Sequence, residues 1–417
     1  MTADAAPGDA PKADSARNVR LVVIVAALGY FVDIYDLILF SVIRVKSLKT
    51  LGVPDAELLD QGVFLINMQM GGMLLGGILW GILGDRRGRL SVLFGSILMY
   101  SLANIANGFV GSVETYAALR LIAGIGLAGE LGAGITLVSE IMQKEKRGFG
   151  TTIVATVGIC GAVVAAIVAD HFDWRTAYFI GGGMGLALLA LRVGVAESGM
   201  FSAVAKKTEV ARGNFFALFS SRDRAKRYLS LIVSGVPIWY GVGILITFSP
   251  EIGENLGLAP APAAGTAVMC DYIGLALGDF ASGALSQVIK SRKRAVLVFM
   301  VITTVALASY FTLGRTSLFA FYASCGLLGF GTGYWAMFVT MASEQFGTNI
   351  RATATTTAPN FVRGAVVPLT FAFTQLKGVL GVQGSAMAIG AVVMVSAFLS
   401  LLALPETFGK DLAFTED

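Results

Sequence analysis

The sequence is short of charge. Only 14% of its 417 residues are Asp, Glu, Lys or Arg, against about 25% in an ordinary soluble domain, while 55% are hydrophobic. A soluble protein of this length could bury a large core, but it would still need a charged surface. The shortage excludes an ordinary soluble fold and predicts a polytopic α-helical membrane protein. The 51 glycines suit helices that pack closely through small residues.

Histidine and cysteine are scarce as well. His171 is the one histidine, which excludes a histidine-based metal site and a catalytic set of acid, histidine and nucleophile. Cys160, Cys270 and Cys325 all fall in apolar segments, where cysteine acts as a small hydrophobic residue rather than as part of a disulfide framework. The net charge of +4 is modest and the cations cluster in loops, so nucleic acid is not an expected partner. We expect no enzyme activity, no metal and no cofactor.

Twelve apolar runs of about 20 residues are each long enough to cross a bilayer as a helix. They lie near 20–43, 60–83, 91–111, 115–140, 150–169, 176–196, 229–250, 263–288, 295–314, 318–341, 355–376 and 382–404. Most of the 31 lysines and arginines fall in loops on the side of the N-terminus. This asymmetry predicts a multi-pass inner-membrane protein with both termini in the cytoplasm.

The longest loop divides the spans six and six. Residues 1–17 lack the apolar core of a signal peptide, and we expect a disordered cytoplasmic tail there. The predicted domains that follow are a six-helix bundle at 18–197, a basic cytoplasmic linker at 198–228, a second bundle at 229–404 and a cytoplasmic tail at 405–417. A basic linker of this kind suits contact with anionic lipid.

The two halves repeat each other. The segment GILGDRRGR follows the second span, and GALSQVIKSRK follows the eighth. Glu140 precedes Arg147 by seven residues after the fourth span, as Glu344 precedes Arg351 after the tenth. Repeated six-helix halves are typical of transporters, which bind their cargo at the interface of the repeats.

In these motifs the sequence resembles the major facilitator superfamily. The run Gly81-x-Leu83-Gly84-Asp85-Arg86-x-Gly88-Arg89 is similar to the signature loop between helices 2 and 3 of that superfamily. Arg120 with Gly124 and Gly126, then Ser139-Glu140 and Arg147-Gly148, is similar to its helix 4 pattern, and Asp173-Trp174-Arg175 and LPETFGKDL resemble further marks. The resemblance covers the whole chain. It implies an all-α membrane protein with twelve transmembrane helices in two pseudo-symmetric six-helix bundles, the major facilitator fold.

Two segments indicate which branch of the superfamily the sequence resembles. Asp33-x-Tyr35-Asp36-Leu37 and GLAGELGAG resemble the proton-coupled anion symporters, which comprise metabolite, aromatic-acid and phosphate:proton branches. The helix 7 aspartate and helix 5 glutamine of the phosphate branch have no counterpart in WYGVGILITF and VATVGICGAVVAA. The helix 5 Gly-Pro of antiporters is missing too, because Ala162 follows Gly161.

Gly124, Gly126 and Gly129 spell Gly-x-Gly-x-x-Gly, the spacing of a dinucleotide-binding loop. Such a loop needs a preceding strand and an acidic residue after the unit. Here the glycines lie inside a long apolar run, so we interpret them as points where helices approach closely.

The resemblance also implies a gate on the cytoplasmic side. In the superfamily the aspartate at the position of Asp85 caps a helix and pairs across the halves when this side is closed. Gln287 replaces the acid in the second copy, which predicts a one-sided gate. The predicted gating residues are Gly81, Asp85, Arg86, Gly88, Arg89, Glu140, Arg147, Glu344 and Arg351. The alternative is that the arginines only orient the chain in the membrane.

Charged residues inside a span are costly and need a structural or functional reason. The acids are Asp33, Asp36, Glu130, Asp271 and Asp279, and the bases are Arg120, Arg192 and Arg363. Helices 1, 4, 8 and 11 line the central cavity in the superfamily. By their positions within the predicted spans, Asp33, Glu130, Asp271 and Arg363 lie near mid-depth on these helices. We predict that Arg192, near the inner end of the peripheral helix 6, snorkels to water.

Asp33 and Asp36 are three residues apart and so share one helix face. Two nearby carboxylates in a medium of low dielectric constant cannot both ionise cheaply, so one of them can load and release a proton. We predict that Asp33, Asp36 and Glu130 bind the coupling proton, or that the aspartates pair with Arg120 to shape the cavity. A static ion pair between helices 1 and 4 is the alternative.

Together these features predict a secondary active transporter that works by alternating access. Arg120 and Arg363 favour proton symport of a small organic anion, because a guanidinium grips a carboxylate with two hydrogen bonds. The predicted substrate-binding residues are Tyr35, Gln69, Arg120, Trp239, Tyr240, Asp271, Tyr334, Asn360 and Arg363.

Two alternatives stay open. The excess of acids over bases in the spans suits a transporter or efflux antiporter of a cationic or zwitterionic molecule, and a transport-inactive sensor or scaffold comes from another class. The expected partners are a small-molecule substrate, protons and the lipid bilayer, with the protein acting as a monomer.

Overall fold

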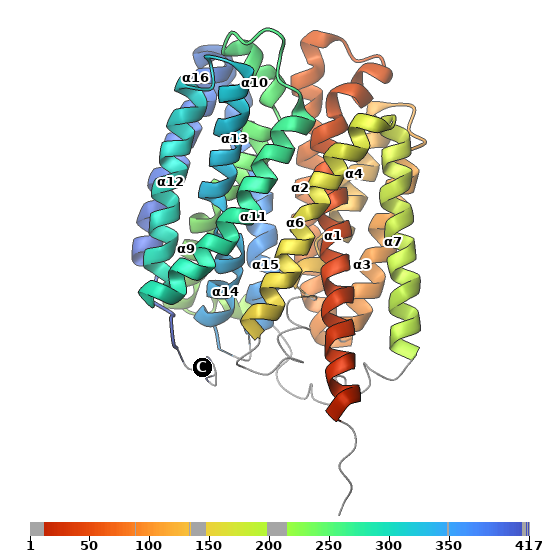
Figure 1. The fold of residues 1–417 in the computed structure, drawn as a ribbon, viewed down its shortest axis with the longest axis vertical. Coiled ribbons are helices and arrows are strands. Elements are labelled where there is room, and N and C mark those ends of the chain that lie inside the picture. Colours follow the sequence, from red (N-terminus) through yellow and green to blue (C-terminus); the bar gives the residue numbers. More distant parts are fainter. Residues whose placement is uncertain are drawn as a thin grey trace, which may run out of the picture.

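The computed structural model describes residues 12–87, 89–132, 134, 147–197, 215–347, 350–410, 414 and 416. These residues form helices and connecting turns, arranged as two bundles that stand side by side (Figure 1). The N-terminal half, red to yellow-green in the figure, contains α1 (Lys12–Thr50), η1 (Asp55–Glu57), α2 (Leu58–Arg87), α3 (Arg89–Asn107), α4 (Val113–Leu127), α6 (Arg147–His171) and α7 (Trp174–Glu197).

The C-terminal half, green to blue in Figure 1, follows after η2 (Phe215–Phe219). Its elements are α9 (Arg222–Tyr240), the π-helical η3 (Gly241–Ile246), α10 (Ser249–Asn255), α11 (Ala264–Ile289), α12 (Arg292–Thr312), α13 (Leu318–Thr332), α14 (Trp335–Gln345), α15 (Arg351–Gly364) and α16 (Val366–Ala403).

The helices match the predicted spans. Nine helical stretches within the described ranges are long and apolar enough to cross a membrane. The longest of these, Thr353–Ala403, is two spans, because Gly381 inside α16 has non-helical dihedral angles. The shorter α3 and α4 complete the set of twelve. The predicted all-α fold with two bundles of six helices is therefore confirmed.

Two predicted domain boundaries differ from the helix ends. α1 begins at Lys12, inside the predicted tail 1–17. α9 begins at Arg222, inside the predicted linker 198–228, because the charged residues of its first two turns interrupted the apolar run in the sequence. Residues 198–214 of that linker lie outside the described ranges.

Serine side chains start four of the helices. Ser112, Ser221, Ser291 and Ser317 each accept the backbone N–H three residues ahead, at 3.1 to 3.2 Å, as N-caps of α4, α9, α12 and α13. An N-cap satisfies one of the N–H groups that the first helical turn leaves without a partner. Polar caps at loop ends let long apolar helices begin at defined residues.

Glycines bring the helices into backbone contact. A Cβ on Gly124 would overlap the carbonyl oxygen of Gln69 on α2, and one on Gly126 would lie 2.7 Å from the backbone nitrogen of Tyr100 on α3. α4 therefore packs on two neighbours through these small residues. The interpretation of the Gly-x-Gly-x-x-Gly segment as a packing motif is confirmed.

We call the end of the molecule where α1 and α9 begin the terminal face, and the end that carries η1 and α10 the distal face (Figure 1). At the distal face the two halves are joined by an ion pair of 2.7 Å between Arg44 and Glu251 and a hydrogen bond of 2.9 Å between Ser41 and Thr247.

Two further contacts join α2 to α16 on the distal side. Lys377 pairs with Asp60 at 2.6 Å, and Thr370 donates to Asn67 Oδ1 at 2.6 Å. Nearer the terminal face, Asn360 Nδ2 donates across the halves to the Ala128 carbonyl at 2.9 Å. The halves are thus in contact on both sides of the membrane centre.

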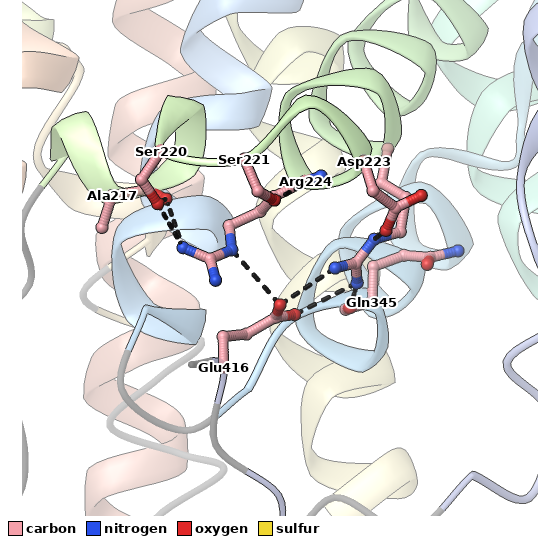
Figure 2. Close-up of polar contacts among 8 residues, drawn as sticks. Ala217, Ser220, Ser221, Asp223, Arg224, Gln345 and Glu416 are labelled. Carbon is pink, nitrogen blue, oxygen red and sulfur yellow. Dashed lines mark hydrogen bonds and ion pairs between the residues drawn. The ribbon is translucent and has the colours of Figure 1, made fainter.

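The C-terminal segment is fastened to the terminal face by Glu416, as Figure 2 shows. Its carboxylate accepts from Arg224 Nε at 3.2 Å and from both terminal nitrogens of Arg227, at 3.1 and 2.9 Å. Arg227 also donates to the Gln345 carbonyl at 2.8 Å. The Glu416 carboxylate therefore links the C-terminal segment to the first turns of α9. Arg227 extends this link to the end of α14.

This contact makes stability depend on pH. Partial burial raises the pKa of Glu416, but hydrogen bonds and charge from Arg227 and Arg224 outweigh it and lower the pKa below the ordinary 4.5. A carboxyl whose pKa is lowered by folding stabilises the folded state above its ordinary pKa, and the contribution is lost as pH falls through the folded value.

We expect Glu416→Gln to reduce the free energy of unfolding by about 1 kcal/mol at pH 7, because the ion pairs with two arginines are lost. The difference in melting temperature from the wild type should stay constant from neutral pH down to about pH 5 and shrink below the ordinary pKa of 4.5. Thermal melts in detergent at several pH values measure it. The exposed distal residue Glu254, changed to Gln, is the control, and an equal shift in both variants would contradict the assignment.

Candidate functional site

An ion pair between the two halves lies at the centre of the molecule. Asp33 on α1 and Arg363 on α15 are 0% and 1% exposed, and Arg363 Nη2 lies 3.9 Å from Asp33 Oδ2. That distance is too long for a hydrogen bond. Neither oxygen of Asp33 and none of the three guanidinium nitrogens has a hydrogen-bond partner among the described residues. The two side chains therefore attract each other by charge alone. The N–H groups of Arg363 and the oxygens of Asp33 remain available to form hydrogen bonds with a ligand.

Two tryptophans enclose the guanidinium. The Cζ atom of Arg363 lies 5.5 Å from the ring centroid of Trp239 on α9 and 5.6 Å from that of Trp335 on α14. The Trp335 Nε1 donates to the hydroxyl of Tyr30 on α1 at 3.2 Å. Distances of this size permit cation–π attraction, which is stronger when the groups are desolvated. An arginine, an acid and aromatic rings from both halves thus form one cluster, which we call the central cluster: Asp33, Arg363, Trp239, Trp335 and Tyr30.

The local structure around Trp239 departs from a regular helix. Pro237 lies inside α9, and the chain continues from Tyr240 as the π-helix η3. Proline removes one backbone hydrogen bond, and π-helical turns often occur at functional sites. The sequence PIWYGVGILI therefore places a tryptophan where the helix widens.

The other predicted acid of α1 has different surroundings. Asp36 is fully buried, and a Cβ on Gly181 of α7 would overlap its Oδ1. Arg120 acts electrostatically on Asp36, while its Nη1 donates to the Tyr178 hydroxyl at 3.3 Å and its Cζ lies 5.3 Å from the Phe40 ring. Asp33 and Asp36 are three residues apart on α1, but their surroundings differ. Asp33 faces Arg363 of the C-terminal half, whereas Asp36 faces residues of its own bundle.

The prediction that Arg192 snorkels to water is wrong. Arg192 is only 3% exposed, and its Nη1 donates to Glu130 Oε2 at 3.0 Å while its Nη2 donates to Oε1. α7 carries Arg192 inward rather than outward, and Gly29 of α1 leaves room for the pair, since a Cβ there would overlap both side chains. Glu130 is the buried partner of Arg192, and the position of Arg192 in the sequence does not reveal this pairing.

The remaining predicted substrate residues are distributed over both bundles. Three of them bond to backbone carbonyls within their own half: Tyr35 to Ala177 at 2.9 Å, Tyr240 to Ala386 at 2.6 Å and Tyr334 to Ser234 at 3.1 Å. Gln69 Nε2 donates to the Leu37 carbonyl at 3.2 Å, and Asn360 joins the halves through Ala128. These five residues stay predictions for substrate binding.

Asp271 of α11 is buried, and neither of its carboxylate oxygens has a hydrogen-bond partner among the described residues. The backbones of α11 and α13 are in close contact here, because a Cβ on Gly329 of α13 would overlap the backbone oxygen of Asp271. Its part in substrate binding stays a prediction as well.

Much of the predicted gate lies outside the described residues. The side chains of Asp85, Arg86, Arg89 and Arg147 lie outside the described parts of the structure, as do Gly88 and Glu140 altogether. Gly81 lies buried on α2, where an added Cβ would be 3.6 Å from Thr357 of α15. In the second copy, Glu344 pairs with Arg292 at 3.2 Å and Arg351 Nε donates to the Phe346 carbonyl at 3.1 Å.

Sequence reasoning missed several residues of the central and distal contacts. Arg44 falls just beyond the first predicted span, 20–43, yet it is 0% exposed and pairs with Glu251. Trp335 and Tyr30 were not singled out. Trp335 follows the break GFGTGY, and a bulky aromatic residue after a glycine-rich break in a span is the signal that could have indicated it.

This arrangement defines a class of protein. Two six-helix bundles enclose a buried charged cluster at their interface, and polar contacts join the bundles on either side of it, which is the organisation of an alternating-access membrane transporter. The chain belongs to the major facilitator superfamily, whose sequence profile matches residues 26–361.

Relatives with known names agree with this membership. The chain is 29% identical over 329 residues to the 3-(3-hydroxy-phenyl)propionate transporter of Escherichia coli, covering 74% of this chain and 76% of that protein. It is 27% identical over 368 residues to the niacin transporter of Acinetobacter baylyi, covering 79% and 80%. Among solved structures, the proton:xylose symporter XylE bound to 6-bromo-6-deoxy-D-glucose shares the fold with a TM-score of 0.70 at 17% identity, covering 96% of this chain and 98% of that one.

The buried pair Glu130–Arg192 yields a stability prediction. Removing one partner leaves an uncompensated charge, so Arg192→Leu should lower the free energy of unfolding by about 3–5 kcal/mol. The double variant Arg192→Leu/Glu130→Leu should recover most of the loss, because two apolar residues often replace a buried pair without penalty.

Melting temperatures of the purified variants test this. A single variant as stable as the wild type would contradict a structural ion pair. The double variant also tests the predicted proton role of Glu130, since a stable protein that still accumulates substrate with a pH gradient does not couple through Glu130.

Proposed function

We propose that this protein is a proton symporter of small organic carboxylates, with a preference for aromatic ones. The observation that carries the proposal is the buried guanidinium of Arg363, which lies between two tryptophans and makes no hydrogen bond to the described residues. A guanidinium offers five N–H donors in a planar fork. A carboxylate can accept two of them at once, with strong charge-assisted bonds.

The tryptophans support the aromatic preference. Trp239 and Trp335 come from α9 and α14, so a carboxylate held by Arg363 would place its organic group beside indole faces. Aromatic pairs contribute about 0.5–1.5 kcal/mol beyond the area they bury. The names of the two relatives, transporters of 3-(3-hydroxy-phenyl)propionate and of niacin, point the same way.

Asp33 supports the coupling. Among the described residues it is the carboxylate that pairs with Arg363, at 3.9 Å. When a substrate carboxylate binds the same guanidinium, two negative charges meet in a medium of low dielectric constant, which favours uptake of a proton by one of them. Binding of the anion and protonation of Asp33 would therefore proceed together, and the loaded site would carry no extra charge across the membrane.

Alternating access would require the contacts on one side to open while those on the other stay closed. On the distal side the contact to break is the partly buried pair Arg44–Glu251, with the bond between Ser41 and Thr247 beside it. On the terminal side the bond from Asn360 to Ala128 closes the path, and we assign the predicted gate around Asp85 to the same side.

The excess of lysine and arginine in the loops on the side of the N-terminus supports a terminal face in the cytoplasm of an inner membrane, by the positive-inside rule. A cationic substrate, the alternative left open by the sequence, would have to approach a guanidinium at the centre of the cluster. The charge of Arg363 therefore favours an anion.

Arg363→Gln should abolish binding of a carboxylate substrate such as benzoate, because both the charge and the paired donors are lost. Arg363→Lys keeps the charge but not the fork, and we expect binding about tenfold weaker. Calorimetry in detergent measures both, with Arg315→Gln at an exposed position as the control. Wild-type affinity in Arg363→Gln, in a monodisperse sample, would overturn the carboxylate site.

Asp33→Asn should stop uphill accumulation driven by a pH gradient, whereas exchange of labelled for unlabelled substrate should persist because the carrier stays neutral at that position. Asp36→Asn is the matched comparison on the same helix face, and we expect it to retain pH-driven accumulation. Uptake and counterflow in proteoliposomes measure both properties. Full proton-driven accumulation in Asp33→Asn, or its loss in Asp36→Asn alone, would contradict the assignment of the proton to Asp33.

A further inference from the structure

The span that carries Trp335 is broken at the level of the central cluster. α13 ends at Thr332, Gly333 and Tyr334 leave the helical path, and α14 begins at Trp335. The first N–H groups of a helix have no partner within it, and Tyr334 at the N-cap supplies no side-chain bond. Inside a membrane protein such groups need an acceptor from another element.

Asp279 on α11 supplies that acceptor. Its Oδ1 accepts the backbone N–H of Ala336 at 3.0 Å, and the residue is 8% exposed. A carboxylate at a helix N-terminus also interacts favourably with the helix dipole. The approach depends on close backbone contact, because a Cβ on Gly333 would lie 2.5 Å from the Gly278 Cα atom. Asp279 has no part in the predicted substrate-binding or proton-coupling sets. Its carboxylate instead points at the start of α14.

The capped end of α14 carries a ring of the central cluster. Trp335 is the residue before Ala336, and three contacts fix its indole: Arg363 at 5.6 Å, the Tyr30 hydroxyl at 3.2 Å and the stacked ring of Phe338 at 5.4 Å between centroids. A shift of the first turn of α14 would move this ring directly. Asp279 therefore reaches the central cluster through the backbone of α14.

We propose that Asp279 is a positioning residue for the substrate site: by capping α14 it holds the Trp335 ring against Arg363 and sets the preference for aromatic over aliphatic carboxylates. The preference rests on the function proposed above, whereas the capping role does not need it. The two parts are therefore tested by separate measurements.

The capping role is tested without substrate. Asp279→Ala removes the acceptor, while Asp279→Asn keeps an oxygen in the same place. The chain has four tryptophans, so the emission of Trp335 is isolated by subtracting the spectrum of the matched Trp335→Phe variant. We expect Asp279→Ala to shift this emission to longer wavelength and expose it to acrylamide quenching, and Asp279→Asn to leave it unchanged. If Asp279→Ala cannot be purified, Asp279→Leu takes its place.

The preference is tested with benzoate and cyclohexanecarboxylate, which carry the same charge on rings of six carbons. In proteoliposomes, Asp279→Ala should raise KM for benzoate about fivefold, as expected for the loss of one aromatic contact, and change KM for cyclohexanecarboxylate less than twofold. The maximal rate should stay within about twofold for both, and Asp279→Asn should restore the KM for benzoate. A merely structural role would instead reduce the rates for both acids together.

The outcomes separate the two proposals. Equal loss for both acids, or an unchanged Trp335 emission in Asp279→Ala, overturns the positioning role of Asp279. If the wild-type protein transports neither benzoate nor cyclohexanecarboxylate, the proposed transport of these carboxylates is wrong. The emission of Trp335 then still decides whether Asp279 caps α14. A shifted emission together with a selective rise in KM for benzoate supports both.

Discussion

A charge pair buried between the halves is the constraint on which the rest of the structure depends. Asp33 and Arg363 come from different bundles, and each would be costly in the membrane interior without the other. Their attraction holds the bundles together at the centre. At 3.9 Å, and with no hydrogen bond to any described residue, it leaves the guanidinium N–H groups able to bind a competing anion. Trp239 and Trp335 lie against the guanidinium, and polar contacts such as Arg44–Glu251 and Asn360–Ala128 connect the halves on the two sides. A site that is strong in charge and weak in hydrogen bonding is suited to reversible exchange of one carboxylate for another.

The fold could be predicted almost entirely from the sequence, because a bilayer leaves few choices. Apolar length fixed the spans, the repeat of GILGDRRGR and GALSQVIKSRK fixed the two halves, and glycine spacing indicated where helices touch. The errors fall where side chains are charged at the membrane surface. α9 begins at Arg222 rather than after the last arginine, since Ser221 caps it and Glu416 accepts from Arg224 and Arg227. Hydropathy does not record such contacts between distant segments.

The site could be predicted in part. Arg363 and Asp33 were found because a charge in an apolar helix needs an explanation, and that argument does not depend on the partner. The partners themselves were not predictable, since pairing depends on helix rotation: Arg363 rather than Arg120 lies beside Asp33, and Arg192 turns inward to Glu130. Trp335 was not singled out, and Asp279 was recognised only as an acid inside a span, for a related reason. Their roles depend on a break in one span and on a cap supplied by another, and neither is visible in the local sequence.

The central claim is that an anionic substrate displaces Asp33 from Arg363 and that a proton enters with it. Calorimetry of benzoate binding in several buffers of different ionisation enthalpy, at one neutral pH, measures the number of protons taken up per ligand bound. The account predicts an uptake approaching one proton in the wild-type protein. Binding of benzoate with no proton uptake at that pH would contradict it.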